Sequence, residues 1–235
     1  MRRKFIIAFL LFNTLLCCGC EMNDLNNTKN STKLTASDIK QLIGVTYDDV
    51  EKIYGSPENS IYYINTNDLS LINKNYISLR DFNHSSIIKS YYNINNNDSY
   101  IVLWYKYNKV ISSSFNERDI INEDYFDTDI NNMDIKIYYN KNASRLDKNL
   151  FTDKYRDYIG NNINEFNSQY NLICPKIVVN FLNNNKVLYF YSIKNENSEY
   201  LNNNSLFVIC DNDIISEISI IKSSKICETI VDYIK

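Results

Sequence analysis

Apolar residues follow a helical period in one part of the chain and a two-residue period in much of the rest. Val50 and Ile53 fall on one side of a predicted helix at residues 47–54, and Thr46 is placed to cap its start. Runs rich in β-branched and aromatic residues predict strands in both halves of the chain. We expect these strands at 87–94, 100–105, 110–115, 176–182, 186–193, 205–210 and 214–221.

The rare glycines mark a repeat. The chain has only 4 glycines, and Gly44 and Gly160 each follow an isoleucine and precede a tyrosine by ten residues. Gly44 is also placed to end a short helix at 38–43, and Gly55 to end the helix at 47–54. The sequence therefore predicts two copies of one unit, each a helical hairpin followed by an antiparallel meander. We expect a first unit at 37–118, a connector at 119–150 with one strand at 135–139, a second unit at 151–222, and a tail or short helix at 223–235.

The first 20 residues have the layout of an export signal. A basic start at residues 2–4 precedes a run of 12 mostly apolar residues, 5–16, and then a cluster of cysteines. A helix needs about 20 apolar residues to span a membrane, so this run predicts a cleaved signal peptide at 1–19 instead. The polar residues that follow predict a tether at 20–36.

The cysteine at the end of this segment resembles the lipobox of bacterial lipoproteins, in which a small residue precedes the lipidated cysteine. Gly19 and Cys20 fit that pattern, while Cys18, with Leu15 three residues before it, is the alternative attachment site. The resemblance implies acyl chains on Cys20, and two or more chains hold a protein stably on a membrane. We therefore expect an extracytoplasmic protein anchored to membrane lipid, on either the cell membrane or the outer membrane.

The charge of the chain argues against a nucleic-acid partner. The formal net charge is −3, and removal of residues 1–19 leaves 22 basic against 28 acidic residues. Nucleic-acid binding depends on lysine and arginine meeting phosphate, and no basic stripe is present. We expect no contact with nucleic acid.

Residues suited to catalysis are scarce. His84 is the only histidine, and its polar surroundings indicate an exposed loop residue. Cys174, Cys210 and Cys227 lack the spacing of a zinc site, and we expect neither a metal nor a cofactor. One pair of these cysteines can form a disulfide outside the cytoplasm, but the sequence does not select the pair. We expect no enzyme, with an acid-based envelope hydrolase as one alternative and a ligand-binding or structural lipoprotein as another.

The repeated motif resembles the BamE-like (SmpA/OmlA) lipoproteins, and its doubled form resembles β-lactamase inhibitory protein. The resemblance implies an α+β fold with two tandem units, each a helical hairpin packed on a curved antiparallel sheet. It also implies a non-catalytic protein that binds a protein partner through an open sheet face. The residues that carry the resemblance are Gly44, Thr46, Val50, Gly55 and Pro57, then Gly160, Phe166, Tyr170 and Pro175 in a second copy that lacks the threonine and the second glycine.

Strand alternation sorts the aromatic residues of the first meander onto two faces. If residues 107–108 form a turn, Tyr105 pairs with Val110. One face then carries Tyr100, Val102, Trp104, Ile111 and Phe115, which we expect to pack against the helices. The other face is more mixed, and we expect it to be the open, partner-binding face, with Ile101, Leu103, Tyr105 and Val110 as candidate binding residues.

Overall fold

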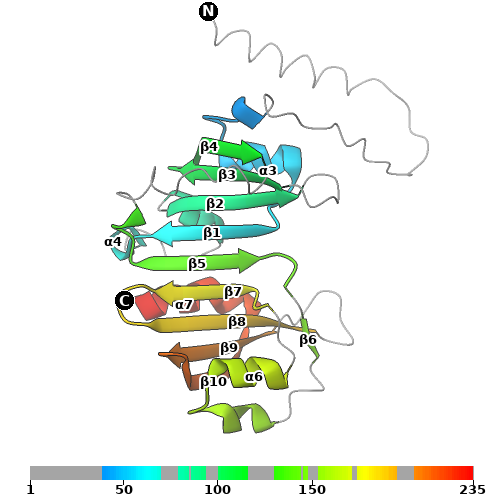
Figure 1. Ribbon diagram of the computed structural model, residues 1–235, viewed down its shortest axis with the longest axis vertical. Coiled ribbons are helices and arrows are strands. Elements are labelled where there is room, and N and C mark those ends of the chain that lie inside the picture. Colours follow the sequence, from blue (N-terminus) through cyan, green and yellow to red (C-terminus); the bar gives the residue numbers. More distant parts are fainter. Residues whose placement is uncertain are drawn as a thin grey trace, which may run out of the picture. The chain divides into compact units, whose positions relative to one another are not determined.

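A ten-stranded sheet is the centre of the computed structural model (Figure 1). The structure describes residues 39–69, 79–84, 86–93, 100–115, 130–143, 145–147, 153–170, 174–194 and 204–234, all of which belong to one compact unit. The predicted signal peptide, tether, Cys18 and Cys20 lie outside the described residues.

Nine strands follow one another across the sheet, each antiparallel to its neighbour. Their order is β10-β9-β8-β7-β5-β1-β2-β3-β4, and β6 pairs in parallel with β8. The strands are β1 (Asn59–Ile64), β2 (Ser86–Asn93), β3 (Tyr100–Lys106), β4 (Lys109–Phe115), β5 (Ile135–Asn140), β6 (Arg145–Asp147), β7 (Ile177–Phe181), β8 (Lys186–Lys194), β9 (Asn204–Asp211) and β10 (Ile214–Lys222).

Short helices connect and flank these strands. They are α3 (Tyr47–Tyr54), α4 (Thr66–Leu69), α6 (Ile163–Gln169) and α7 (Ile226–Ile234), with 3-10 helices η2 (Leu79–His84), η5 (Asp153–Tyr158) and η6 (Ser223–Lys225). The predicted cap of α3 is present, because the Thr46 hydroxyl accepts from the Asp49 backbone N–H and donates to the Asp49 carboxylate at 2.8 Å. We refer below to α3 with β1–β4 as the first half, and to α6 with β7–β10 as the second half.

The predicted fold of two tandem helical-hairpin units is wrong, because both halves belong to one continuous sheet. β5, from the predicted connector, pairs with β1 on one side and β7 on the other, so that Ile137 lies opposite both Tyr62 and Val179. The helical hairpin is also incomplete, since residues 41–44 form a turn and the second half has only a 3-10 helix, η5, before α6. Backbone pairing through β5 merges what the sequence suggested were separate sheets.

The helices of the two halves lie on opposite faces of this sheet. Tyr47 of α3 contacts Tyr105, and α7 packs against the same face of the second half; we call this the α7 face. Phe166 of α6 packs with Tyr191 and Val208 on the other side, the α6 face. β1 and β7 run in the same direction and their meanders spread away from β5 in opposite directions. The two halves are therefore related by roughly a half-turn about the strand direction. Such a rotation exchanges the two faces of the sheet, so the helix before each meander lies on opposite faces in the two halves.

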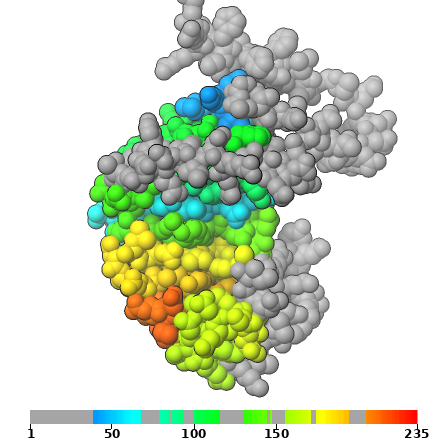
Figure 2. Space-filling view, viewed as in Figure 1, coloured from blue at the N-terminus to red at the C-terminus, as the bar shows by residue number. Residues whose placement is uncertain are grey.

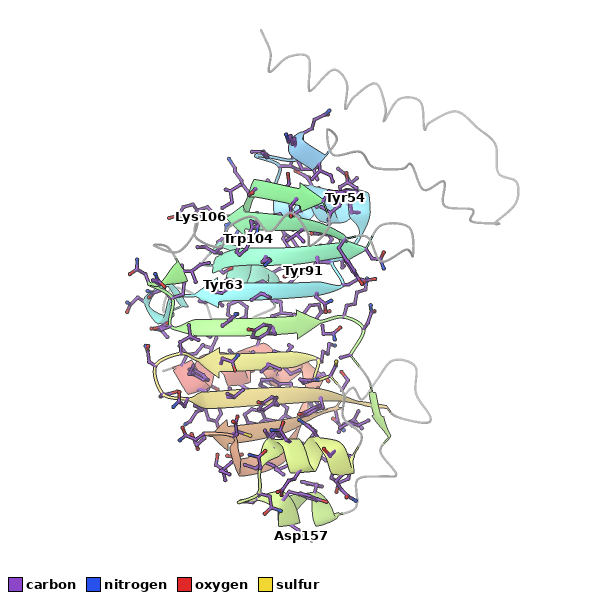
Figure 3. All side chains as sticks on the ribbon, viewed as in Figure 1. Tyr54, Tyr63, Tyr91, Trp104, Lys106 and Asp157 are labelled. Atoms are coloured by element: carbon purple, nitrogen blue, oxygen red, sulfur yellow. The ribbon has the colours of Figure 1, made fainter. Side chains whose placement is uncertain are left out.

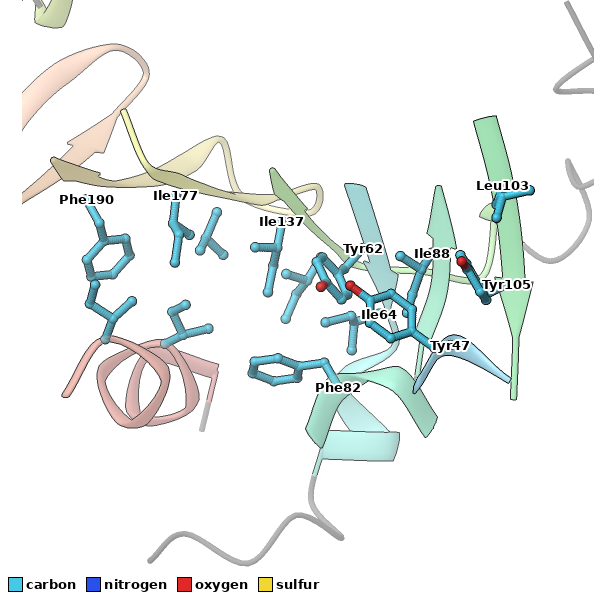
Figure 4. Close-up of a cluster of buried hydrophobic side chains, with 14 of the residues drawn as sticks. Tyr47, Tyr62, Ile64, Phe82, Ile88, Leu103, Tyr105, Ile137, Ile177 and Phe190 are labelled. Atoms are coloured by element: carbon cyan, nitrogen blue, oxygen red, sulfur yellow. The ribbon is translucent and has the colours of Figure 1, made fainter. Parts of the chain in front are cut away.

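The main core fills the α7 face from end to end (Figure 4). Phe82 of η2 and the residues of α7 cover it, and Phe190 stacks on Phe207 at a centroid distance of 4.9 Å. The Tyr92 and Tyr105 hydroxyls hydrogen-bond at 2.9 Å, which satisfies two polar groups inside this core. Burial raises the pKa of Tyr47 to about 12, and it also raises the pKa of Tyr92 and Tyr105.

The repeated glycine segments serve the same purpose at the two ends of the sheet. Gly44 donates its N–H to the Val110 carbonyl of β4 at 2.7 Å, and Gly160 donates to the Ile215 carbonyl of β10 at 2.8 Å. Both glycines have positive φ, +89° and +93°, which favours glycine over other residues. Each segment thus pairs with part of an outer strand, so that backbone groups at both sheet edges are satisfied.

Candidate binding face

The residues predicted to form the open face are in the core. Ile101, Leu103 and Tyr105 are 0% exposed and Val110 is 1% exposed, and all four pack on the α7 face. The assignment of the two faces of β3 was therefore reversed. The predicted turn at Tyr107 and Asn108 is confirmed, with φ of 51° and 62°, and so is the Tyr105–Val110 pair. The alternation was correct, but both faces of β3 are apolar, so the sequence could not indicate which one the helix covers.

A cluster of lysines and aromatic rings occupies the α6 face of the first half (Figure 3). Tyr63 and Trp104 stack nearly parallel, with centroids 6.2 Å apart and planes at 17°. The Lys89 ammonium lies 5.0 Å from the Trp104 centroid and 5.6 Å from that of Tyr91. We define the lysine–aromatic cluster as these residues with Lys136 and Tyr138, that is, Tyr63, Lys89, Tyr91, Trp104, Lys136 and Tyr138.

Lys136 repeats this arrangement on the neighbouring strand β5. Its ammonium lies 5.2 Å from the Tyr63 centroid and 4.9 Å from that of Tyr138. Burial alone would lower the pKa of Lys136, but interactions with Tyr138 and Tyr63 outweigh it and raise the pKa. Lys136 therefore stays protonated near neutral pH, and each ammonium lies over two rings in cation–π geometry.

Strand register brings these side chains together. Trp104 lies opposite Lys89, and Tyr63 lies opposite Lys136. A register shift between Trp104 and Tyr105 places Trp104 opposite Ser112, where the sequence predicted Ile111. The cluster thus draws on four adjacent strands, β3, β2, β1 and β5, that are distant in sequence.

This face is basic although the whole chain is acidic. Strands β1–β5 and β7 contain no aspartate, glutamate or arginine, and their lysines are Lys89, Lys106, Lys109 and Lys136. Lys106 and Lys109 pair across the β3–β4 hairpin on the same face as the cluster. The formal net charge of the chain is −3, so positive charge is concentrated here against an acidic background.

A pocket of about 510 Å³ opens beside the cluster, at one end of strands β1, β2, β5 and β7. Tyr91 and Tyr138 belong to both the cluster and the pocket lining. Figure 2 shows the β1, β5 and β7 segments, in cyan, green and yellow, side by side on this face. The α6-face part of the lining consists of Asn59, Ile61, Tyr91, Tyr100, Tyr138, Asn140 and Val178.

The α6 face of the second half is covered by α6. Phe166 is 0% exposed and lies between the rings of Tyr158 and Tyr170, with centroids at 5.3 and 4.9 Å. The Tyr191 hydroxyl donates to the Asn167 side chain at 2.7 Å. Among the described residues, the lysine–aromatic cluster differs from this packing because lysines lie over its rings. Trp104 and Tyr63 are buried, at 1% and 6% exposed, while Lys89, Tyr91, Lys136 and Tyr138 are half-buried.

The three cysteines in the described part of the chain do not form a disulfide. Cys174, Cys210 and Cys227 are free thiols, and Cys210 and Cys227 belong to clusters on opposite faces of the sheet. Burial raises the pKa of Cys210 to about 12 and that of Cys227 to about 11, so both are thiols at neutral pH.

Other predicted features are placed as follows. His84 is exposed at the end of η2. Within the described ranges, no group of three or more His, Cys, Asp and Glu side chains is arranged to hold a metal ion. The helices in the described part of the chain are too short or too polar to cross a membrane.

Comparison with known proteins gives little beyond these observations. No family model matches the chain, and no curated protein matches it. Two solved structures are similar at low identity. A candidate β-lactamase inhibitor protein from Streptococcus mutans has a TM-score of 0.29 and 11% identity, over 84% of this chain and 90% of that one. A candidate lipoprotein from Clostridium difficile has a TM-score of 0.19 and 10% identity, over 78% and 97%.

One of these proteins is described as a β-lactamase inhibitor protein and the other as a lipoprotein, the same two kinds of protein that the sequence motif resembles. Their TM-scores are too low to support any statement about the fold or activity of this chain, and a relation to BamE-like proteins is not shown.

Proposed function

We propose that this protein is a lipid-anchored, extracytoplasmic lipoprotein that binds a protein partner through the lysine–aromatic cluster and its pocket. The observation that carries the proposal is the cluster itself, in which Lys89 and Lys136 each lie over two aromatic rings beside a pocket of about 510 Å³. Tyrosine and tryptophan are enriched among the residues that dominate binding energy at protein interfaces. Concentrated positive charge adds steering toward an acidic partner.

The membrane part of the proposal rests on the sequence of the first 20 residues. We expect cleavage before Cys20 and lipid on that cysteine. The test is incorporation of labelled palmitate in the native host: Cys20→Ala should abolish it, whereas Cys18→Ala should leave it intact. Loss of label in Cys18→Ala alone would move the anchor to Cys18.

Partner binding is tested by cross-linking the full chain in envelope membranes and identifying what it captures. The variant Lys89→Glu/Lys136→Glu should lose the cross-linked partner. The control Lys52→Glu/Lys225→Glu carries the same change in charge on exposed lysines of α3 and η6, and it should retain the partner. Equal capture by both variants would contradict the proposed face.

A ligand-binding function is the second candidate, because a pocket of about 510 Å³ lies within the range of small-molecule sites. No carboxylate is among the described residues that line it, so this pocket offers no support for the acid-based hydrolase. A small molecule that copurifies and is released by Tyr138→Ala would favour the ligand reading over a protein partner.

A further inference from the structure

We infer that the pocket receives an aromatic side chain from an acidic segment of the partner protein, with the flanking carboxylates on Lys89 and Lys136. This inference rests on the proposed function and names the partner's chemistry.

The walls of the pocket favour an aromatic occupant. Tyr91 and Tyr138 line it, and Ile61 and Val178 add apolar surface between and beside them. Aromatic rings pack well against other rings in stacked or edge-to-face arrangements. The size of the pocket, about 510 Å³, leaves room for one side chain and its neighbouring backbone.

The charges around the pocket favour an acidic segment. Lys89 lies over the ring of Tyr91, and Lys136 over that of Tyr138, so each cation is adjacent to a ring that lines the pocket. Lys106 and Lys109 lie at the opposite end of β3 and β4 from the lining residue Tyr100, so Lys89 and Lys136 are the lysines of these strands nearest the pocket. Glu58, whose backbone N–H donates to the Tyr91 carbonyl, is the acidic residue next to the lining residue Asn59. Carboxylates on either side of an inserted ring would meet these ammonium groups, and charge-assisted hydrogen bonds are the stronger kind.

Asparagine side chains supply polar contacts at the end of the pocket. Asn59 and Asn140 are opposite each other on β1 and β5, and both line it. The Asn140 Oδ1 accepts from the Asn142 backbone N–H at 2.9 Å, so Asn140 would offer mainly its amide N–H groups to the backbone of an inserted segment.

Trp104 provides a built-in reporter for the test. It is the only tryptophan in the chain, and the Lys89 ammonium lies 5.0 Å from its ring. A carboxylate that engages Lys89 changes the electric field at this indole, so binding should change its emission. The probe is a tryptophan-free peptide, acetyl-Glu-Asp-Phe-Asp-Glu-amide, titrated into the full chain in detergent at low salt.

Three comparisons test the inference. The probe should bind, and replacement of its Phe by Ala, or of its acids by Lys, should weaken binding at least tenfold. Lys89→Ala/Lys136→Ala should weaken it at least tenfold, whereas Lys52→Ala/Lys225→Ala should change it less than twofold. Tyr138→Ala should weaken binding of the probe, and Tyr138→Phe should restore it. Circular dichroism checks that each variant folds. For variants in which Lys89 is changed, binding is followed by the fluorescence anisotropy of a labelled probe and not by tryptophan emission.

Each negative result has a distinct meaning. If the probe does not bind but envelope capture still depends on Lys89 and Lys136, this inference fails and the proposed function stands. If capture is also independent of both lysines, both fail. If the probe binds only after Glu123, Asp124 and Asp127 are replaced by amides, the acidic segment that contains Tyr125 and Phe126 is the native occupant, and the partner assignment is overturned.

Discussion

The two halves of the molecule use the α6 face of the same sheet differently. In the second half, α6 covers this face, and Phe166 closes a cluster with Tyr191, Val208 and Cys210. In the first half, the described cluster on this face consists of strand residues around Trp104, with Ile130 and Met133 packed against it, and lysines extend over the rings. The α7 face carries one continuous core in both halves. A buried α7 face thus holds the sheet together, while on the α6 face of the first half half-buried lysines lie over the buried rings of Trp104 and Tyr63.

The largest expected effect tests whether α6 closes a core in the second half. Phe166→Ala should lower the free energy of unfolding by about 3–5 kcal/mol, because it empties a fully buried ring site. Tyr138→Ala, in the half-buried pocket wall, should cost less than about 2 kcal/mol. Urea unfolding followed by circular dichroism compares the two, and equal losses would break the contrast between the halves.

Alkaline unfolding tests the buried tyrosines of the first half. The pKa of Tyr47 is about 12 in the folded protein, against an ordinary value of 10.0, and burial is the main cause. The folded chain therefore keeps this proton at a pH where the unfolded chain has lost it. Its contribution is complete below pH 10 and is lost as pH rises from about 10 to 12, a loss of roughly 3 kcal/mol.

Tyr47→Phe removes this titrating group and supplies the control. The variant should lose less stability than the wild type over that pH range when urea unfolding is measured at each pH. A loss of the same size in both proteins would assign the effect to other groups, such as Tyr189 in the second half, whose pKa burial also raises to about 12.

Substitution of the repeated glycines should show where the halves are alike. Gly44→Ala and Gly160→Ala meet no atom within 4 Å, so their cost comes from the positive φ alone. We expect each to lower the free energy of unfolding by about 1–2 kcal/mol. Thermal unfolding of the two variants should give matched losses, and a loss in only one would mean that the two edge contacts are not equivalent.

The smallest expected effect separates binding from stability. Lys89→Ala and Lys136→Ala should each change the free energy of unfolding by less than about 1 kcal/mol, since both lysines are only half-buried even though the Trp104 and Tyr63 rings beneath them are buried. The same variants should lose partner binding. Urea unfolding provides the check, and a loss above 3 kcal/mol in either variant would make these lysines part of the scaffold.

Much of the strand content could be predicted from the sequence. The β3–β4 hairpin, its turn at Tyr107 and Asn108, and the Tyr105–Val110 pair follow from local chemistry. β1 was not predicted as a strand, although its residues Ile61–Ile64 are apolar or aromatic. The four candidate residues of β3 and β4 were expected on an open face but are buried, because the alternation of β3 offers two apolar faces and the position of α3 decides between them.

The site that we propose was not visible along the chain. Lys89, Trp104 and Lys136 are neighbours only because β1, β2, β3 and β5 pair in this order. The lack of acidic residues in these strands was an available signal, but it does not show which strands are adjacent.

The sequence by itself determined the local structure of this protein: the α3 cap, the hairpin turns and the glycine segments depend on a few neighbouring residues. Only the tertiary structure decided that β5 joins both meanders into one sheet, that the helices lie on opposite faces, and that the lysines meet the aromatic rings. The physical reason is that strand pairing acts over long sequence separations. Strands with the same alternation of apolar and polar residues can be arranged in more than one order in a sheet, and the order that buries the most apolar surface is selected.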